Sequence, residues 1–185
     1  LYVLGDAIDR GPRGVEILRD IMARPNIHMI LGNHEQMMLD SFQSANYEEA
    51  RRLWKYNGGC KTYQAMKYKI SRNDSLGILR FVKKLPEYLD IEVNGRKFHL
   101  VHGYVGENRH DRIWRRPEPL PTKAPLPGRT VIVGHTPTCI LRPDVEEDSF
   151  QIFHGTGFID LDCGCGHADD RCRLACLRLD DMREF

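Results

Sequence analysis

Leu1-Tyr2-Val3-Leu4-Gly5-Asp6-Ala7-Ile8-Asp9-Arg10-Gly11, at the start of the chain, is the stretch that decides the fold. Its first four residues are apolar and predict a buried strand, and the glycine and charged residues after them predict the loop at the strand end. Open α/β sheets bind ligands at the carboxyl ends of their strands, so Asp6 and Asp9 are candidate functional residues. The same pattern also fits a turn with solvated charges.

Three further apolar runs end in side chains that bind metals or transfer protons. They are residues 27–31 before Gly32-Asn33-His34-Glu35, residues 97–101 before His102-Gly103, and residues 130–133 before Gly134-His135-Thr136. Apolar side chains recur at helical spacing over residues 15–22 until Pro25. Strand, helix and strand predict a βαβ unit with parallel strands, which brings Asp6 and Asn33 to the same sheet edge. Four such strand ends favour a functional site over a solvated turn.

The middle of the chain predicts helices followed by a hairpin. Residues 36–42 and most of residues 46–85 have helical patterns. The aromatic residues of the second segment are expected to pack in a small core: Tyr47, Trp54, Tyr56, Tyr63 and Tyr68. Asn94-Gly95 lies between strand-like residues 88–93 and 97–101, which is a strong signal for a two-residue β-hairpin.

The last part of the chain predicts an irregular segment followed by strands. Residues 104–128 contain five prolines and predict a surface loop without regular structure. The acidic residues 144–148 are expected to form a solvated turn. Strand-like patterns complete the fold at residues 150–153, 158–161 and 174–179. We find no repeat, and expect one domain over residues 1–185.

Composition places the chain among globular proteins and gives no sign of a highly charged partner. It has 185 residues, 41% of them hydrophobic and 29% charged, with a net charge of +1. So small a charge predicts neither nucleic acid nor membrane as a general partner. We see no signal peptide, and no apolar run approaches the ~20 residues of a membrane span, so we expect a cytoplasmic protein.

Six cysteines without a secretory signal indicate a reducing compartment. Four of them lie between Cys163 and Cys176, with His167 among them, so a structural zinc or a disulfide is an alternative to reduced thiols. The Cys-x-Cys spacing is unusual for a zinc finger. We expect Cys176 to be a small apolar filler within a strand.

The side chains at the four strand ends have the chemistry of a divalent metal site. Asp6, Asn33, His102 and His135 supply oxygen and imidazole ligands, which suit manganese, iron or zinc. The neutral amide of Asn33 fits a site where a bridging carboxylate already supplies charge. Such a centre can activate water and polarise a phosphoryl oxygen, which predicts metal-assisted hydrolysis.

The charged residues beside these ligands suit the rest of a phosphoryl transfer. His34 can act as the general acid that protonates a leaving alkoxide, and Asp9 can hold it in the correct tautomer. Arg10 and Arg116 are candidates for binding phosphate oxygens, which the guanidinium fork does well. The remaining histidines are expected to be ordinary structural residues.

The ordered set Gly-Asp-x-x-Asp-Arg-Gly, Gly-Asn-His-Glu, His-Gly and Gly-His-Thr resembles the calcineurin-like metallophosphoesterases. Within them it is similar to the bacterial phosphoprotein phosphatases that resemble the phage lambda enzyme. The resemblance extends over nearly the whole chain, including Trp54 with Asn57-Gly58-Gly59 and residues 159–164. It implies an α/β (α+β) fold with a central β-sandwich flanked by helices. It also implies in-line attack on the phosphate by a metal-bridging hydroxide, without a phosphoenzyme.

The resemblance also implies a role for each candidate residue. Asp6 would bridge two divalent metal ions, most simply manganese, with iron and zinc as alternatives. The second metal site would be completed by Asn33, His102 and His135. His34 and Asp9 would form the acid dyad. Arg10 would bind the phosphate together with Arg116, for which Arg115 is an alternative.

This chain departs from the family pattern at two places. The family begins with Gly-Asp-x-His-Gly, whose Asp and His hold the first metal, and no Asp-x-His occurs in the 185 residues. We therefore expect that the first strand and helix of the domain are missing and that the chain alone has little activity. Adding about 30 upstream residues, a strand and a helix, is expected to restore it. Leu31 also replaces the arginine that lambda-like enzymes have before Gly-Asn-His-Glu.

Three functions remain open from the sequence. The preferred one is a protein serine/threonine phosphatase, with possible activity on phosphotyrosine, because Asp9-Arg10 and Glu35 resemble that group. The second is a symmetrical diadenosine tetraphosphate hydrolase, because a leucine before Gly-Asn-His, such as Leu31, resembles the pattern of that group. The third is a module that binds phosphopeptides without hydrolysing them, which the lack of the first metal motif would explain.

Overall fold

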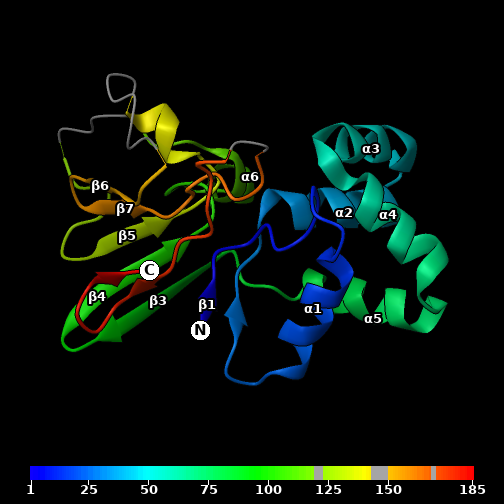
Figure 1. Ribbon diagram of the computed structural model, residues 1–185, viewed down its shortest axis with the longest axis horizontal. Coiled ribbons are helices and arrows are strands. Elements are labelled where there is room, and N and C mark those ends of the chain that lie inside the picture. The colour runs from blue at the N-terminus through cyan, green and yellow to red at the C-terminus, as the bar shows by residue number, and fades with distance from the viewer. Residues whose placement is uncertain (119–122, 143–149, 168–169) are drawn as a thin grey trace. The chain divides into compact units, whose positions relative to one another are not determined.

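The computed structural model describes residues 1–118, 123–142, 150–167 and 170–185 (Figure 1). The chain divides into two compact units, Leu1–Pro86 and Glu87–Phe185. The first unit is mostly helical, and the second is built on a mixed β-sheet. The predicted mixed α/β class is confirmed. The predicted sandwich and the single domain stay predictions.

The first unit begins with the expected βαβ unit. Strand β1 (Tyr2–Val3) pairs in parallel with β2 (His28–Met29), and helix α1 (Gly14–Ala23) connects them. The helix buries Val15, Leu18 and Ile21, the apolar stripe read from the sequence. Helix α2 (Asn33–Gln43) begins after three further residues. The parallel pairing places the loop after β1 and the start of α2 at the same end of the two strands.

The rest of the first unit is helical, as predicted. It comprises α3 (Tyr47–Trp54), the π-helical turn η1 (Lys55–Gly59), α4 (Cys60–Gln64), the π-helical turn η2 (Ala65–Lys69) and α5 (Arg72–Lys83). Helix α2 packs against α3 and α5. Trp54 and Tyr63 are buried in this core, as expected.

The other three aromatic residues of this segment are not core residues. Tyr47 is 46% exposed, Tyr68 is 70% exposed and Tyr56 is 90% exposed, so the prediction of a small aromatic core is wrong for them. Trp54 and Tyr63 already fill the space beside Phe42, with ring centroids 6.0–6.2 Å apart. The remaining rings therefore lie on the solvent side of the segment.

The second unit contains a five-stranded sheet with the order β3-β4-β5-β7-β6. Strands β3 (Tyr88–Val93) and β4 (Arg96–Val101) form the predicted hairpin, and Asn94 and Gly95 both have positive φ, as a type I′ turn requires. Strands β4, β5 (Thr130–Val133) and β7 (Phe158–Asp160) run parallel, and β6 (Phe153–Gly155) is antiparallel to β7. Val101, Val131, Val133 and Phe158 are the centre of the core.

Several predicted elements of the second unit differ in the structure. Helix α6 (Arg109–Trp114) lies in the segment expected to lack regular structure, because its first proline follows only at Pro117 and Asn108 caps the helix by accepting from the backbone N–H of Asp111 at 2.9 Å. The strand expected at residues 150–153 begins only at Phe153.

The end of the second unit also differs from the prediction. The strand expected at residues 174–179 is reduced to β8 (Leu177–Arg178), paired with β9 (Arg183–Glu184). Cys176 lies before this strand and is exposed, so it is not a buried filler. The acidic residues 144–148 lie outside the described residues. No helix in the described residues has the length and apolarity needed to cross a membrane.

Candidate active site

The loop after β1 has an unusual backbone that needs support from its surroundings. Asp6, Asp9 and Arg10 all have positive φ, at 53°, 75° and 55°, and Gly5 has φ of 88°. A non-glycine residue in this region costs roughly 1–3 kcal/mol and persists only where neighbouring groups hold it. Such strain is typical of functional loops, and this loop carries three of the predicted site residues.

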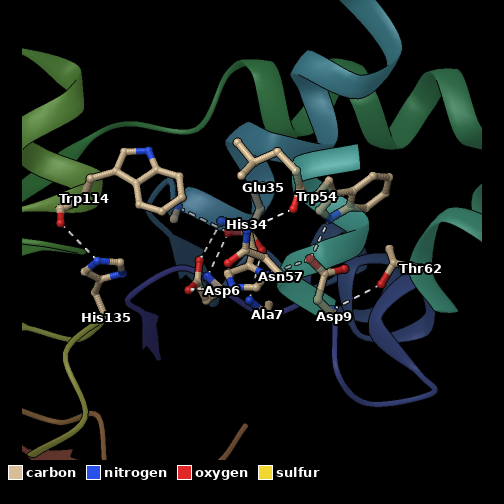
Figure 2. Close-up of polar contacts among 12 residues, drawn as sticks. Asp6, Ala7, Asp9, His34, Glu35, Trp54, Asn57, Thr62, Trp114 and His135 are labelled. Carbon is tan, nitrogen blue, oxygen red and sulfur yellow. Dashed lines mark hydrogen bonds and ion pairs between the residues drawn. The ribbon is translucent and has the colours of Figure 1, made fainter. Parts of the chain in front are cut away.

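Glu35 supports the first part of that loop. Its carboxylate is fully buried and accepts from the backbone N–H groups of Asp6 at 2.8 Å, Ala7 at 3.0 Å and Gly32 at 3.2 Å (Figure 2). One side chain thereby joins the strained loop to the start of α2. From the sequence, Glu35 was only a point of resemblance to the protein phosphatases. A glutamate three residues after a helix-capping position is nevertheless a sign of this bond.

Asp6 contacts the first turn of α2, which contains Asn33. The Asp6 Oδ1 atom accepts from the backbone N–H of His34 at 3.0 Å, and Asn33 is buried in the first turn. Gly32 makes the approach possible, because a Cβ atom there would collide with the Asp6 carboxylate and lie 2.7 Å from Glu35 Oε2. The loop that carries Asp6 and the start of α2 therefore lie at the same end of the parallel strand pair, as the predicted βαβ unit requires.

His34 and Asp9 form a buried hydrogen-bonded pair. The His34 Nδ1 atom lies 2.7 Å from Asp9 Oδ2, and the same oxygen accepts from the indole N–H of Trp54 at 2.6 Å. Since an ionised carboxylate can only accept, His34 donates its Nδ1–H, and Nε2 is the nitrogen that can exchange a proton. That atom lies 3.9 Å from Asp6 Oδ2. The backbone N–H of Asp9 donates to Thr62 Oγ1 at 3.2 Å.

The surroundings of His34 favour its protonated form. Burial lowers the pKa of the imidazole, but the hydrogen bond to Asp9 and the charges of Asp6 and Asp9 outweigh burial, so the pKa lies above the usual 6.5. Arg10 opposes this rise. An imidazolium near neutral pH is suited to donate a proton, which is the role predicted for His34 from the sequence.

Arg10 is exposed and is held through its backbone. Its N–H donates to the carbonyl oxygen of Gly58 at 3.1 Å, and Lys61 Nζ donates to its carbonyl oxygen at 3.1 Å. Gly58 has φ of 99°, and a Cβ atom there would lie 2.9 Å from the Arg10 side chain. The Asn57-Gly58-Gly59 stretch therefore lets the helical segment approach Arg10. The sequence alone gave no role in the site to this stretch, to Trp54 or to Thr62.

The second unit brings His102 and His135 together after two neighbouring parallel strands. His102 follows β4 and is buried, and its carbonyl oxygen accepts from the N–H of Gly134 at 2.9 Å. The two imidazole centroids are 5.1 Å apart. His135 has φ of 66°, and its Nε2 atom lies 3.1 Å from the carbonyl oxygen of Trp114 (Figure 2). A carbonyl accepts only, so Nε2 carries the proton and the lone pair of the imidazole is on Nδ1.

The two candidate arginines of the second unit follow α6. The Arg115 side chain donates to the carbonyl oxygen of Val105 at 3.4 Å and lies over the ring of Tyr104. Arg116 is exposed. The backbone of Gly103 donates to Arg112 at 2.7 Å, which ties this helix to the loop after β4.

All six cysteines are free thiols in the structure. Burial raises the pKa of Cys163, although the guanidinium of Arg173 opposes it. Among the described residues, no group of three cysteines and histidines has the spacing of a metal site in the segment from Cys163 to Cys176. The structure therefore lends no support to a structural zinc or a disulfide there.

Comparison with known proteins agrees with the motifs. The sequence profile of the family described as calcineurin-like phosphoesterase matches residues 1–155. Serine/threonine-protein phosphatase 2 of Salmonella typhimurium is 30% identical over 111 residues, which are 60% of this chain and 48% of that protein. The protein of the same name from Escherichia coli is 26% identical over 102 residues, 55% of this chain and 44% of that protein. The matches thus cover less than half the length of these relatives.

A solved structure with some likeness is the crystal structure of a metallophosphoesterase from Sphaerobacter thermophilus. It has 18% sequence identity and a TM-score of 0.47, and the match covers 86% of this chain and 63% of that one.

Proposed function

Because the chain belongs to the calcineurin-like phosphoesterase family, we propose that it hydrolyses phosphate monoesters of serine and threonine in proteins. The family is metal-dependent, and the two bacterial relatives are named serine/threonine phosphatases. The preferred substrate is a phosphoprotein or phosphopeptide.

The proposed metal ligands are the four side chains at the ends of the predicted strands. Asp6 and Asn33 offer oxygen donors beside the start of α2, and His102 and His135 offer imidazole nitrogens after β4 and β5. This donor set fits a divalent ion such as manganese, iron or zinc, and manganese is our first choice. Bound metal ions would supply activation of the attacking water and neutralisation of charge on the phosphoryl oxygens.

The acid in the reaction is His34. A serine or threonine alkoxide leaves only if it is protonated, and the Nε2 proton of His34 is the one available for this step. Asp9 holds the ring by its Nδ1–H and stabilises the imidazolium, and Trp54 holds Asp9 in turn. The buried His34–Asp9 pair is the single observation that carries the proposal. It can donate a proton to a serine or threonine alkoxide, a poor leaving group that needs one.

Phosphate binding is assigned to Arg10 and Arg116. Arg10 presents its guanidinium to solvent from a backbone held at Gly58 and Lys61. Arg116 is preferred over Arg115 because the Arg115 side chain already contacts Val105 and Tyr104. A guanidinium binds two phosphate oxygens at once and so orients the phosphoryl group.

A second candidate function is hydrolysis of diadenosine tetraphosphate, which Leu31 favours. Leu31, the residue before Gly32, is buried and apolar. The lambda-like phosphoprotein phosphatases have an arginine at this position. A phosphate contact at this position is therefore lost for either substrate, and only measured rates can separate the two.

The test compares three substrates with the full-length protein and Mn²⁺. We expect turnover of a phosphoserine peptide and of p-nitrophenyl phosphate, and His34→Asn should lower kcat on the peptide by about 10²–10⁴-fold. Faster turnover of diadenosine tetraphosphate than of the peptide would favour the second function. Phosphopeptide binding without turnover of any substrate would favour a binding module and refute both.

A further inference from the structure

The helical segment 47–69 has an unusual surface that the proposed reaction does not use. It contains six cationic side chains and only two acidic ones, whereas the whole chain has a net charge of +1, so the remainder is net negative. The cationic residues are Arg51, Arg52, Lys55, Lys61, Lys67 and Lys69. Three tyrosines expected in the core are exposed on the same segment. We call these six cations with Tyr47, Tyr56 and Tyr68 the basic surface.

Three of the cations are arranged around one tyrosine ring. The charged ends of Lys55, Arg51 and Lys67 lie 4.4, 5.1 and 5.6 Å from the centroid of Tyr63. Arg51 also lies over Tyr47, and Lys67 over Tyr68, each at 5.1 Å. A ring attracts a cation to its face, so these contacts gather positive charge at one place.

The ring that gathers these charges is part of the core. Tyr63 is 6% exposed and packs edge-on against Trp54, with centroids 6.2 Å apart. Burial raises its pKa, but Lys67, Arg51 and Lys55 outweigh burial and lower it, which reports a positive local potential. The cations are thus held on a packed platform.

The gathered cations lack acidic partners within the described part of the chain. No carboxylate there lies within 4.0 Å of the charged groups of Arg51, Lys55 or Lys67, and the Nε atom of Arg51 is buried without a hydrogen-bond acceptor. Arg51, Arg52 and Lys55 line an open hollow together with Glu48. Cations without an acidic neighbour are available to pair with the carboxylates of an incoming segment.

The basic surface is continuous with the phosphate-binding residue Arg10. The backbone of Gly58 accepts from Arg10, and Lys61 donates to the carbonyl oxygen of Arg10. Trp54, on the other side of the segment, donates to Asp9. Residues 47–69 therefore supply both the hydrogen bond that holds Asp9 and the positive charge of the basic surface.

We propose that the basic surface binds an acidic segment of the phosphoprotein substrate, next to the phosphorylated residue. This inference rests on the proposed function. A protein segment is favoured over nucleic acid because the charge is local, and a chain of net charge +1 lacks the field that draws a polyanion. Each exposed ion pair adds little, so the preference arises from several pairs and is sensitive to salt.

The experiment uses two phosphoserine peptides that differ only in four flanking residues, glutamate in one and glutamine in the other. With the full-length protein, Mn²⁺ and about 0.05 M salt, the KM of the acidic peptide should be about 10-fold lower. The variant Arg51→Gln/Lys55→Gln/Lys67→Gln should lose this preference. The control Arg19→Gln/Arg80→Gln/Lys84→Gln, with the same charge change on α1, on α5 and at the end of α5, should keep it. Both should retain wild-type kcat/KM on p-nitrophenyl phosphate.

Several results would overturn the inference. They are an unchanged preference in the first variant, equal loss in the control, or tighter binding of oligo-dT than of the acidic peptide. If the first variant does not fold, the wild-type preference must still disappear between about 0.05 and 0.5 M salt. Fluorescence anisotropy with an unphosphorylated glutamate-rich peptide separates the two proposals. Salt-sensitive binding that the variant loses supports the basic surface even if no phosphatase activity is found.

Discussion

Buried carboxylates are held differently in the two units. In the first, Glu35 accepts three backbone N–H bonds, and one oxygen of Asp9 accepts from both His34 and Trp54, although its other oxygen has no partner among the described residues. In the second, Asp160 is fully buried and accepts one backbone N–H, from Asp162, at 2.9 Å. Its Oδ2 atom has no partner in the described structure, and burial raises its pKa well above 3.8.

The difference separates carboxylates that act as anions from one that favours its neutral form. Glu35 and Asp9 support a loop and an imidazole through hydrogen bonds that are strongest to a charged acceptor. Asp160 lies at the end of β7 with little to stabilise a charge, and the nearby Asp162 raises its pKa further. Removing charge should therefore harm the first unit and benefit the second.

Asp9→Asn should give the largest effect. The asparagine keeps the shape but cannot stabilise an imidazolium, so kcat on a phosphoserine peptide should fall by about 10²–10⁴-fold. p-Nitrophenyl phosphate has a leaving group that needs no proton, and its kcat should fall by less than about 10-fold. Steady-state kinetics on both substrates measures the contrast. Equal losses on both would mean that Asp9 acts on the metal centre or the fold rather than on the acid.

Glu35→Gln should have the next largest effect, and the effect is on the stability of the fold. The amide offers one good acceptor where the carboxylate serves three N–H groups, so the strained loop loses support and the free energy of unfolding should fall by about 3 kcal/mol. Urea denaturation followed by circular dichroism measures this. Glu16→Gln, an exposed position on α1, is the control and should change it by less than about 0.5 kcal/mol.

Trp54→Phe tests the residue that donates a hydrogen bond to Asp9 from behind the His34–Asp9 pair. The ring still fills the core, but Asp9 loses the 2.6 Å bond from the indole N–H. A hydrogen bond to a charged group is worth roughly 1.5–3 kcal/mol, so kcat on the phosphoserine peptide should fall by about 10-fold. A uniform rise in KM on all substrates, with kcat unchanged, would show that Trp54 serves binding and not the position of Asp9.

Asp160→Asn should give the smallest effect and the opposite sign. Because the pKa of Asp160 is raised in the folded state, its contribution to wild-type stability is fully present below pH 3.8 and is lost as pH rises through the raised pKa. The variant lacks this loss and should be more stable at pH 7.5 by about 1 kcal/mol. Thermal unfolding from pH 4 to 8 compares the two. A variant less stable than wild type at pH 7.5 would mean that the ionised form is the native one.

Much of the fold follows from local pattern. The parallel βαβ unit, the helical segment 47–83 and the hairpin at Asn94-Gly95 were predictable, because strand length, helical spacing and turn residues are local properties. Helix α6 and the exposed tyrosines were not. The five prolines of residues 104–128 predicted a loop, although the part before Pro117 forms a capped helix. Burial of an aromatic ring depends on which neighbours already fill the core, and this is not a local property.

The sequence by itself determined the family, the parallel start of the fold and the identity of the candidate metal, acid and phosphate residues, because these are ordered motifs at strand ends. Only the tertiary structure decided what holds them. Glu35, Trp54 and Thr62 contact the loop of Asp6 and Asp9 from 28 to 53 residues away in the chain. The carbonyl oxygen of Trp114 likewise contacts His135 from 21 residues away. Such support depends on hydrogen bonds between distant segments, which no local pattern encodes.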